Sequence, residues 1–397
     1  MIRSRIPLLS CLLTACLLSA QPAIAHDPSA WGGMFRTRDA GGTWLPIDGG
    51  MFIGGAIALA IDPVDPNHLL YATDTRLLRS HNGGRDWVPE QASVFFGPTL
   101  AVAFDARGRT ALAATSAGMY GNDGTREWTP VAIPAAASPV RAIAAGAAGH
   151  YFVAGARGLY RTLDAGATWQ RIGESLPEAS ATALVVRAHP VDTVHAEAVY
   201  AVVEGTVWAS PDGGASWAQR SAGLPAGRAE TIALDASAAE RLWSAGEGRL
   251  YVSDDAGQTW GAHGAPVPEA GISIRGIAVS RDGSHFALTT HRGVYRSHDS
   301  GNSWALVESN LPVHLEAGPM VRDPSDPDTF YAGFSLTPFG EIWRRAEQGN
   351  SLLSQIDPVS LAGGGAFLGL LAVGGVLLVR RLARRAGPAG SPTTKSP

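Results

Sequence analysis

The chain has 397 residues, of which 45% are hydrophobic and 17% charged. This composition is typical of packed globular domains and excludes a disordered chain. Residues 26–357 contain 35 acidic and 24 basic residues, a net charge of −11, so we expect no nucleic-acid partner. The 48 glycines and 26 prolines fall between short apolar runs, which favours an all-β fold with many tight turns.

The N-terminal residues 1–25 are predicted to be a signal peptide. Arg3 and Arg5 precede an apolar run over 6–20, and Ala-Ile-Ala at 23–25 provides small residues for cleavage before His26. A second interpretation uses Leu-Thr-Ala-Cys at 13–16, which is similar to a lipoprotein processing site with Cys16 lipidated. Cys11 and Cys16 are the two cysteines of the chain, so removal of 1–25 leaves no disulfide, thiolate metal site or cysteine nucleophile.

One turn pattern, Ser/Thr-x-Asp-x-Gly-x-Ser/Thr-Trp, recurs along residues 26–347. Five copies are complete, a sixth replaces the aspartate by asparagine, and a seventh lacks the glycine register. Their acidic or amide residue and tryptophan are Asp39 and Trp44, Asn82 and Trp87, Asp123 and Trp128, Asp164 and Trp169, Asp212 and Trp217, Asp255 and Trp260, and Asp299 and Trp304.

The spacing of these turns predicts the architecture. Successive tryptophans are 43, 41, 41, 48, 43 and 44 residues apart, the length of a four-stranded propeller blade. Asp or Asn closes such a turn by accepting backbone N–H groups, glycine supplies a positive φ, and tryptophan packs between blades. We therefore predict a seven-bladed β-propeller over 26–347, with residues 34–47 completing a last blade whose inner strands come from 318–345.

These turns resemble the Asp-box, or BNR, repeat of sialidases, sortilin-type receptors and photosystem II assembly factors. The resemblance implies that the box joins the third and fourth strands of a blade and is structural. Over residues 30–347, with the boxes and the Asp-Pro-x-x-Pro turns, the chain is similar to exported relatives of the photosystem II assembly and stability factors. That similarity implies binding of membrane-protein intermediates without catalysis.

A glycosidase is the alternative function, because sialidases share the repeat. Met34-Phe35-Arg36 looks like the start of the sialidase Phe-Arg-Ile-Pro motif, but no proline follows and equivalent arginines precede other boxes. Glycoside hydrolysis needs two carboxylates facing one sugar. Four carboxylates are not explained by boxes or Asp-Pro turns and are candidates, or else solvated surface charges: Glu204, Glu230, Glu247 and Glu316. Histidine and aspartate spacings match no zinc or calcium motif, so we expect no metal and no cofactor.

Three charged residues occupy equivalent positions near the start of the inner strands of three different units. Arg141, Glu230 and Arg275 are expected to converge at the mouth of the central channel, where propellers commonly dock ligands. They are candidates for partner binding, or else they pair with one another as a structural network.

The C-terminal residues are predicted to anchor the chain. After a linker at 348–358, residues 359–379 are uncharged and long enough to span a bilayer as a helix. The basic tail 380–397 begins with an arginine cluster that should stay cytoplasmic, which places the propeller in the periplasm or outside the cell. Gly365 and Gly369 form a GxxxG pair that could support a homodimer. A cleaved surface-sorting tag is the alternative to a permanent anchor.

From the sequence we therefore expect a membrane-tethered, extracytoplasmic scaffold without catalytic residues. Its partners would be the membrane, through its own helix, and other envelope proteins. The alternative is an extracytoplasmic glycoside hydrolase or a carbohydrate-binding protein.

Overall fold

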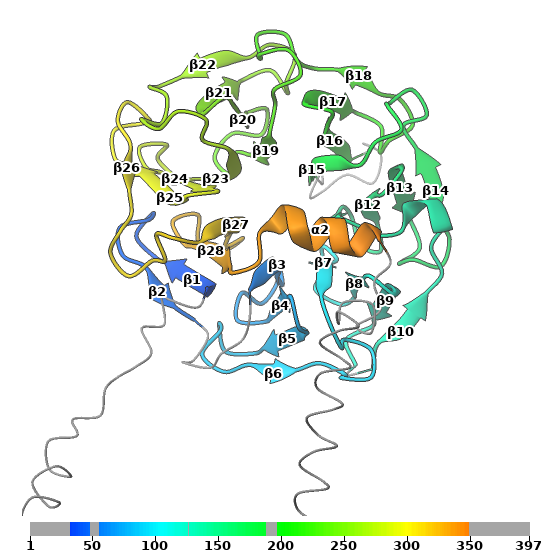
Figure 1. The fold of residues 1–397 in the computed structure, drawn as a ribbon. Helices are drawn as coiled ribbons and strands as arrows, with labels where there is room; N and C mark the ends of the chain where they lie inside the picture. Colours follow the sequence, from blue (N-terminus) through cyan, green and yellow to red (C-terminus); the bar gives the residue numbers. More distant parts are fainter. Residues whose placement is uncertain (1–31, 48–54, 126, 188–196, 349–397) are drawn as a thin grey trace, which may run out of the picture. The chain divides into compact units, whose positions relative to one another are not determined.

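The computed structural model describes residues 32–47, 55–125, 127–187 and 197–348. In this part of the chain, strands form seven four-stranded antiparallel sheets arranged as blades around a central axis (Figure 1). The predicted seven-bladed propeller is confirmed.

The blades follow one another in chain order, each running from an inner strand to an outer strand. Blade 1 consists of β3 (Ala56–Ile61), β4 (Leu69–Thr73), β5 (Leu77–Ser80) and β6 (Val88–Pro89). Blade 2 consists of β7 (Thr99–Phe104), β8 (Ala111–Thr115), β9 (Gly118–Asn122) and β10 (Thr129–Val131). Blade 3 consists of β11 (Ala142–Ala145), β12 (Tyr151–Gly155), β13 (Gly158–Thr162) and β14 (Gln170–Ile172). Blade 4 consists of β15 (Ala181–Arg187), β16 (Ala198–Val203), β17 (Thr206–Ser210) and β18 (Ala218–Gln219). Blade 5 consists of β19 (Thr231–Leu234), β20 (Leu242–Gly246), β21 (Arg249–Ser253) and β22 (Gly261–His263). Blade 6 consists of β23 (Ile274–Val279), β24 (Phe286–Thr290), β25 (Gly293–Ser297) and β26 (Ala305–Leu306). A short 3₁₀ helix, η2 (Ala135–Ala137), precedes blade 3.

Blade 7 is built from both ends of the propeller, as predicted. From inner to outer strand it consists of β27 (Glu316–Arg322), β28 (Phe330–Ser335), β1 (Gly33–Thr37) and β2 (Leu45–Pro46), and β28 pairs with β1. The ladder runs from Gly33 opposite Phe334 to Thr37 opposite Phe330. This pairing closes the ring, and each blade keeps only short edges, which are protected by the radial arrangement.

The core consists of apolar layers between neighbouring blades. One layer, for example, joins Leu112 and Met119 of blade 2 to Tyr151 and Val153 of blade 3. The inner and middle strands are buried on both faces, as the sequence Leu69–Thr73 shows with all five residues buried. Continuous apolar runs in these strands therefore reflect packing against two neighbours rather than one.

A helix that the sequence analysis missed follows blade 7. The predicted last blade extended to 345, but β28 ends at Ser335 and residues Phe339–Glu347 form α2. Pro338 stands at its N-cap position, Glu341 lies in its first turn and basic residues lie in its last turn, which suits the helix dipole. Its apolar residues at 339, 342, 343 and 346 follow the i, i+3, i+4, i+7 spacing of an amphipathic helix, a signal that was present in the sequence.

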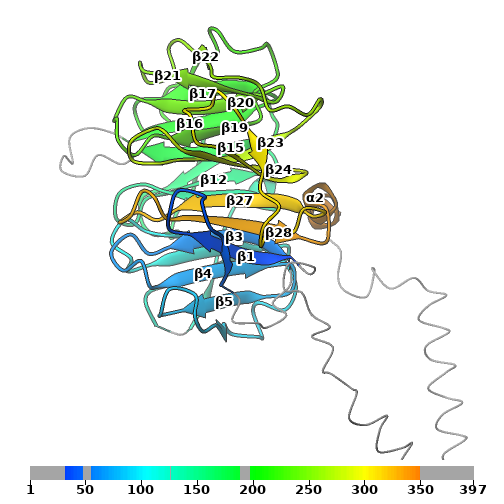
Figure 2. The same cartoon turned by 90° about the vertical axis from the view of Figure 1, so that its left-hand side faces the viewer.

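The propeller disc has two distinct faces, seen from the side in Figure 2. The box face carries the turns between the third and fourth strands and those between the first and second. The helix face carries the starts of the inner strands and α2. The first described residue, Gly32, and the last, Gln348, both adjoin strands or helix at the helix face.

Among the described residues, no helix is long and apolar enough to cross a membrane. The predicted signal peptide 1–25 with Cys16, the linker after Gln348, the span 359–379 with Gly365 and Gly369, and the tail 380–397 lie outside the described residues.

Candidate functional site at the channel mouth

The Asp boxes use their polar groups within the turn itself. The buried Ser or Thr that begins the turn accepts the N–H of the box glycine, as Ser210 does from Gly214 at 2.7 Å. Asp212 accepts the hydroxyl of Ser210 at 2.7 Å on one oxygen and that of Ser216 at 2.6 Å on the other. Both carboxylate oxygens are therefore engaged locally.

Hydrogen bonds also explain the acidity of these aspartates. The pKa values of Asp164, Asp255 and Asp299 are lowered to about 2, and the largest cause in each case is a hydroxyl of the same turn. A further contribution comes from the backbone N–H of the Ser or Thr before the tryptophan. Such carboxylates stay ionised at neutral pH and are poor general acids.

Four box tryptophans, Trp87, Trp128, Trp260 and Trp304, link their blade to the one before it. The indole N–H of Trp87 donates to the carbonyl of Ile47 at 2.6 Å, that of Trp260 to Arg220 at 2.8 Å, and that of Trp304 to Ala265 at 2.9 Å. Trp217 instead donates to Gly214 of its own box at 3.1 Å. The indole N–H groups of Trp44 and Trp169 are buried without a hydrogen-bond acceptor in the described part of the chain.

The third turn corrects the predicted role of Asp123. Asn122 pairs with Ala111 at the register where Ser80 pairs with Leu69, so Asn122 takes the place of the box Ser or Thr. Its side-chain amide donates to the carbonyl of Glu127 at 2.9 Å and accepts the N–H of Gly124 at 3.1 Å. Asp123 is exposed and its hydrogen bonds go to the N–H and the side chain of Thr125. The turn is one residue shorter from strand to tryptophan, and this shift was hidden because an aspartate stands beside the asparagine.

The arginine that looked like a sialidase residue ties two blades together. Arg36 donates from Nη1 to the carbonyl of Gly83 in the box of blade 1 at 2.8 Å. Equivalent arginines do the same across other blade boundaries: Arg161 to Gly213 at 2.5 Å and Arg296 to Gly41 at 3.0 Å. The recurrence of one contact at three boundaries gives Arg36 a structural role.

The structure brings the three candidate residues of the channel mouth to the helix face, where α2 contacts two of them. Arg141 forms an ion pair with Glu347 and lies 5.3 Å from the ring centroid of Trp343. Arg275 lies 5.2 Å from the ring of Phe339, at the other end of the helix. Figure 1 shows α2 lying across the centre of the ring.

A fourth residue, Glu316, joins this cluster through Arg275. Its Oε2 accepts Arg275 Nη1 at 2.9 Å and the backbone N–H of Phe339, the first residue of α2, at 3.0 Å. Glu230 accepts the N–H of Ile274, the residue before Arg275, at 2.6 Å. Glu316 was only one of four unexplained glutamates in the sequence, and its position at the start of β27 gives it a role beside Arg275.

The two glutamates of the channel mouth have opposite pKa shifts. Burial raises the pKa of Glu230, and repulsion from Glu247 raises it further. The hydrogen bond from the N–H of Ile274 and the charge of Arg275 lower it but do not outweigh burial. For Glu316 burial also acts upward, but the hydrogen bonds from Arg275 and Phe339 outweigh it and leave the pKa lowered. The other two candidates stand in turns: Glu204 between β16 and β17, and Glu247 between β20 and β21, where it faces the exposed Arg228.

The floor beneath α2 is apolar. Ile342 and Ala346 of the helix are buried with Ile57 of blade 1 and Leu100 of blade 2. Together with Arg141 of blade 3, Arg275 of blade 6 and Glu316 of blade 7, these residues give α2 neighbours on five of the seven blades. The helix therefore closes the channel mouth on this face.

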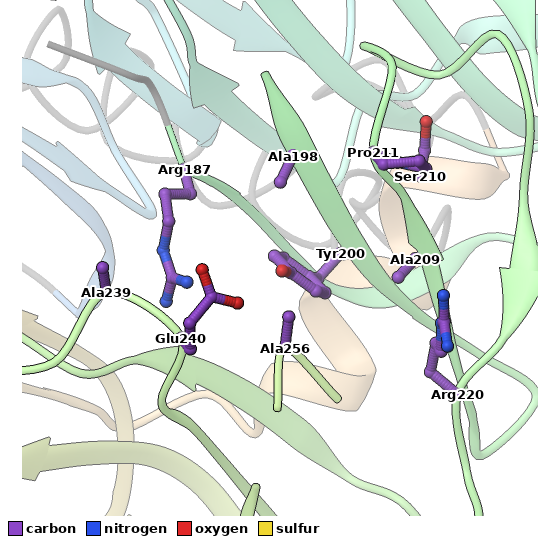
Figure 3. Close-up of a pocket in the computed structure, with 10 residues that line it drawn as sticks. All are labelled: Arg187, Ala198, Tyr200, Ala209, Ser210, Pro211, Arg220, Ala239, Glu240 and Ala256. Carbon is purple, nitrogen blue, oxygen red and sulfur yellow. The ribbon is translucent and has the colours of Figure 1, made fainter. Parts of the chain in front are cut away.

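A separate pocket of about 400 Å³ opens on the box face between blades 4 and 5. Figure 3 shows Arg187 and Glu240 on one side of Tyr200 and Arg220 on the other. Burial raises the pKa of Tyr200. Glu240 is the only carboxylate among the described residues that line it, so these residues alone do not provide the carboxylate pair of a glycosidase. In the described ranges, no group of three or more His, Cys, Asp and Glu side chains is arranged to hold a metal ion.

Comparison with known proteins supports the resemblance drawn from the repeats. A family model described as "Photosynthesis system II assembly factor YCF48" matches residues 121–310. The chain is an Asp-box propeller that resembles the photosystem II assembly factors. No curated protein matches its sequence significantly.

Two solved structures of YCF48 share the architecture. One, described as YCF48 bound to D1 peptide, superposes with a TM-score of 0.54 at 16% identity, over 80% of this chain and 98% of that one. YCF48 from Cyanidioschyzon merolae gives a TM-score of 0.50 at 16% identity, over 71% of this chain and 95% of that one. At these identities the similarity is one of fold.

Proposed function

We propose that this Asp-box propeller is a non-catalytic scaffold that binds segments of other envelope proteins during their assembly or stabilisation. The observation that carries the proposal is the match of residues 121–310 to a family of assembly factors. A protein of the same fold is described with a peptide of D1 bound to it, which supports peptide binding by such a propeller. A propeller fold by itself is compatible with many functions.

The distribution of carboxylates also favours binding over catalysis. The box aspartates are engaged in their own turns, and the Asp-Pro turns use theirs in the same way, since Asp62 and Asp323 each cap backbone N–H groups two residues on. At the channel mouth, Glu316 is bonded to Arg275 and to α2.

Membrane tethering is part of the proposal and rests on the sequence of 359–379. Because the described chain ends at the helix face, a tether that continues from Gln348 starts from that face. Eleven linker residues span at most about 40 Å when extended. A tethered propeller would thus keep partner membrane proteins within reach of the channel mouth.

Photo-crosslinking in intact cells tests this proposal. Lys395 is the only lysine of the chain, so amine-reactive reagents find no side-chain amine on the propeller. A photoreactive residue is placed instead of the exposed Arg228 on the helix face, and the matched control replaces the exposed Arg85 on the box face. We expect adducts with integral membrane proteins from position 228 and few from position 85, and lower amounts of the same proteins when the chain is depleted. Equal adducts from both positions, or unchanged amounts on depletion, would contradict the scaffold.

The glycosidase alternative has one observation in its favour, the opposite pKa shifts of Glu230 and Glu316 on either side of Arg275. A screen of glycoside substrates with the wild type, Glu230→Gln and Glu316→Gln decides it. Turnover by the wild type that both variants abolish while remaining folded would replace the scaffold with an enzyme.

A further inference from the structure

Helix α2 is held at the channel mouth by few buried side chains. Of its nine residues, only Ile342 and Ala346 are buried, with 5% and 7% of their surface exposed. A helix of this length is not stable alone in water, so its helical conformation depends on the surface beneath it. The channel mouth is thus a surface that already binds and orders a short amphipathic helix.

The contacts at the two ends of α2 are of a kind that another helix could make. Arg275 faces the aromatic ring of Phe339 at the first turn, and Arg141 faces Trp343 and Glu347 at the last. The Arg141 and Glu347 side chains are 26% and 46% exposed, and an ion pair this exposed contributes little net stability. Exchange of α2 for a competing segment therefore loses no deeply buried ion pair.

The surface beneath α2 has space for an aromatic ring at the N-terminal end of the helix. Gly318 in β27 lies directly under Phe339, and a Cβ added at this glycine would overlap the ring. The backbone of Gly318 needs no positive φ, so the absence of a side chain serves this contact rather than the strand. The hydroxyl of Thr289 binds the Gly318 carbonyl at 2.8 Å and holds the strand in place.

We propose that the channel mouth is a groove for an amphipathic helix with an aromatic residue in its first turn and an acidic residue at its end, and that α2 closes this groove in cis. The partner is a helical segment of an envelope membrane protein, and this choice of partner rests on the proposed scaffold function. Binding in trans requires α2 to leave, so the apparent affinity for partners is the intrinsic affinity multiplied by the fraction of molecules in which the groove is open.

A tethered competitor is effective because of its local concentration. A segment joined by a short connection acts at a millimolar effective concentration, even when its intrinsic affinity is weak. Three residues, 336–338, connect β28 to α2, so α2 re-docks readily. Weakening α2 should therefore raise the apparent affinity for an added helix by about tenfold or more.

The experiment uses a synthetic peptide with the sequence of residues 337–348, labelled with a fluorophore, and the full chain in detergent. Binding is followed by fluorescence anisotropy, and the docked state of α2 by hydrogen exchange. We expect weak binding to the wild type and at least tenfold tighter binding to the Ile342→Asp chain, in which a charge at a buried position releases α2. Adding Arg141→Glu to that chain should reduce the gain, because the ion pair with Glu347 of the peptide becomes a repulsion, whereas the matched box-face change Arg85→Glu should leave it intact.

Two further variants keep the test decisive if Ile342→Asp fails to fold. Glu347→Arg weakens the docking of α2, because it replaces the ion pair with Arg141 by a repulsion without touching a buried residue. Adding Gly318→Ala to this chain should weaken binding of the 337–348 peptide, because the new methyl group overlaps the ring of Phe339. Binding of a peptide with alanine in place of Phe339 should not be weakened, because it has no ring to overlap.

The outcomes separate the groove from the scaffold function. Three results would each overturn the groove. The first is no gain in peptide affinity when α2 is weakened or released, and the second is a gain that Arg141→Glu does not change. The third is a gain that light scattering traces to dimers exchanging α2. The peptide assay involves no envelope protein, so its failure leaves the crosslinking result at position 228 to decide the scaffold function by itself.

Discussion

The two faces of the propeller use their charged residues in different ways. On the box face, the box aspartates meet partners within four residues of the same turn, as Asp39 does with Thr37 and Thr43. On the helix face, Arg141 and Glu347 meet across 206 positions of the sequence. Contacts of the first kind belong to the fold, whereas contacts of the second kind hold a segment that could be replaced.

This difference separates stability from binding. Changes on the box face should lower the stability of the whole ring, because tryptophans such as Trp260 also bond their box to the neighbouring blade. Changes on the helix face should leave the ring folded and alter what occupies the channel mouth.

Replacement of Trp260 by alanine should have the largest effect. Trp260 is 6% exposed, packs in the layer between blades 4 and 5 and donates to the carbonyl of Arg220. Loss of a buried aromatic side chain costs about 3–5 kcal/mol of unfolding free energy. Urea denaturation measures this cost, and Trp260→Phe, which keeps most of the packing but loses the N–H, should cost about 1 kcal/mol plus a small packing loss. A loss below about 1 kcal/mol for the alanine variant would contradict the role of the box tryptophan as a link between blades.

Replacement of Ser210 by alanine should have a smaller effect. The Ser210 hydroxyl is buried, accepts the N–H of Gly214 at 2.7 Å and donates to Asp212. An unpaired buried N–H costs about 1–3 kcal/mol. The control is Ser210→Thr, since Thr37 and Thr162 hold the same position in other boxes, and it should be close to neutral. Equal destabilisation by both variants would mean that the hydroxyl is not what matters there.

The contrast between the faces also explains what could be predicted from the sequence. The box residues fall at fixed spacing, so the pattern gives the turns, the number of blades and the closure by residues 34–47. The register of the third turn was lost because Asn122 and Asp123 are adjacent and both are plausible turn residues.

The channel mouth was only partly predictable. Equivalent positions in the repeat placed Arg141, Glu230 and Arg275 on one face, because every inner strand starts there. Their partner α2 lies outside the repeat, so no periodicity pointed to it, although its own apolar spacing did. The pocket beside Tyr200 could not be predicted, since its lining comes from two blades and from no motif.

Acid should weaken the box face. The folded-state pKa values of Asp164, Asp255 and Asp299 are about 2, below the ordinary value of 3.8. Because these pKa values are depressed, the ionised carboxylates stabilise the fold at any pH above the ordinary pKa of 3.8. This stabilisation is lost as the pH falls toward 2. Melting temperatures between pH 5 and pH 2 should therefore decrease, and Asp164→Asn should make the decrease smaller. A melting temperature that is flat over this range would contradict the hydrogen-bonding role of the boxes.

Glu230 on the helix face should show the smallest effect, with the opposite sign. Burial raises its pKa above the ordinary value of 4.5, so its ionised form opposes folding at neutral pH and protonation relieves this cost. Glu230→Gln keeps an oxygen for the N–H of Ile274 and removes the charge, so we expect a small rise in melting temperature at pH 7 that fades below pH 4. Glu316→Gln is the matched control, because its pKa is lowered by Arg275 and its replacement should instead lower the melting temperature at pH 7. A destabilising Glu230→Gln would mean that the charge of Glu230 supports Arg275 more than burial penalises it, and the channel mouth would then be a structural network of ion pairs.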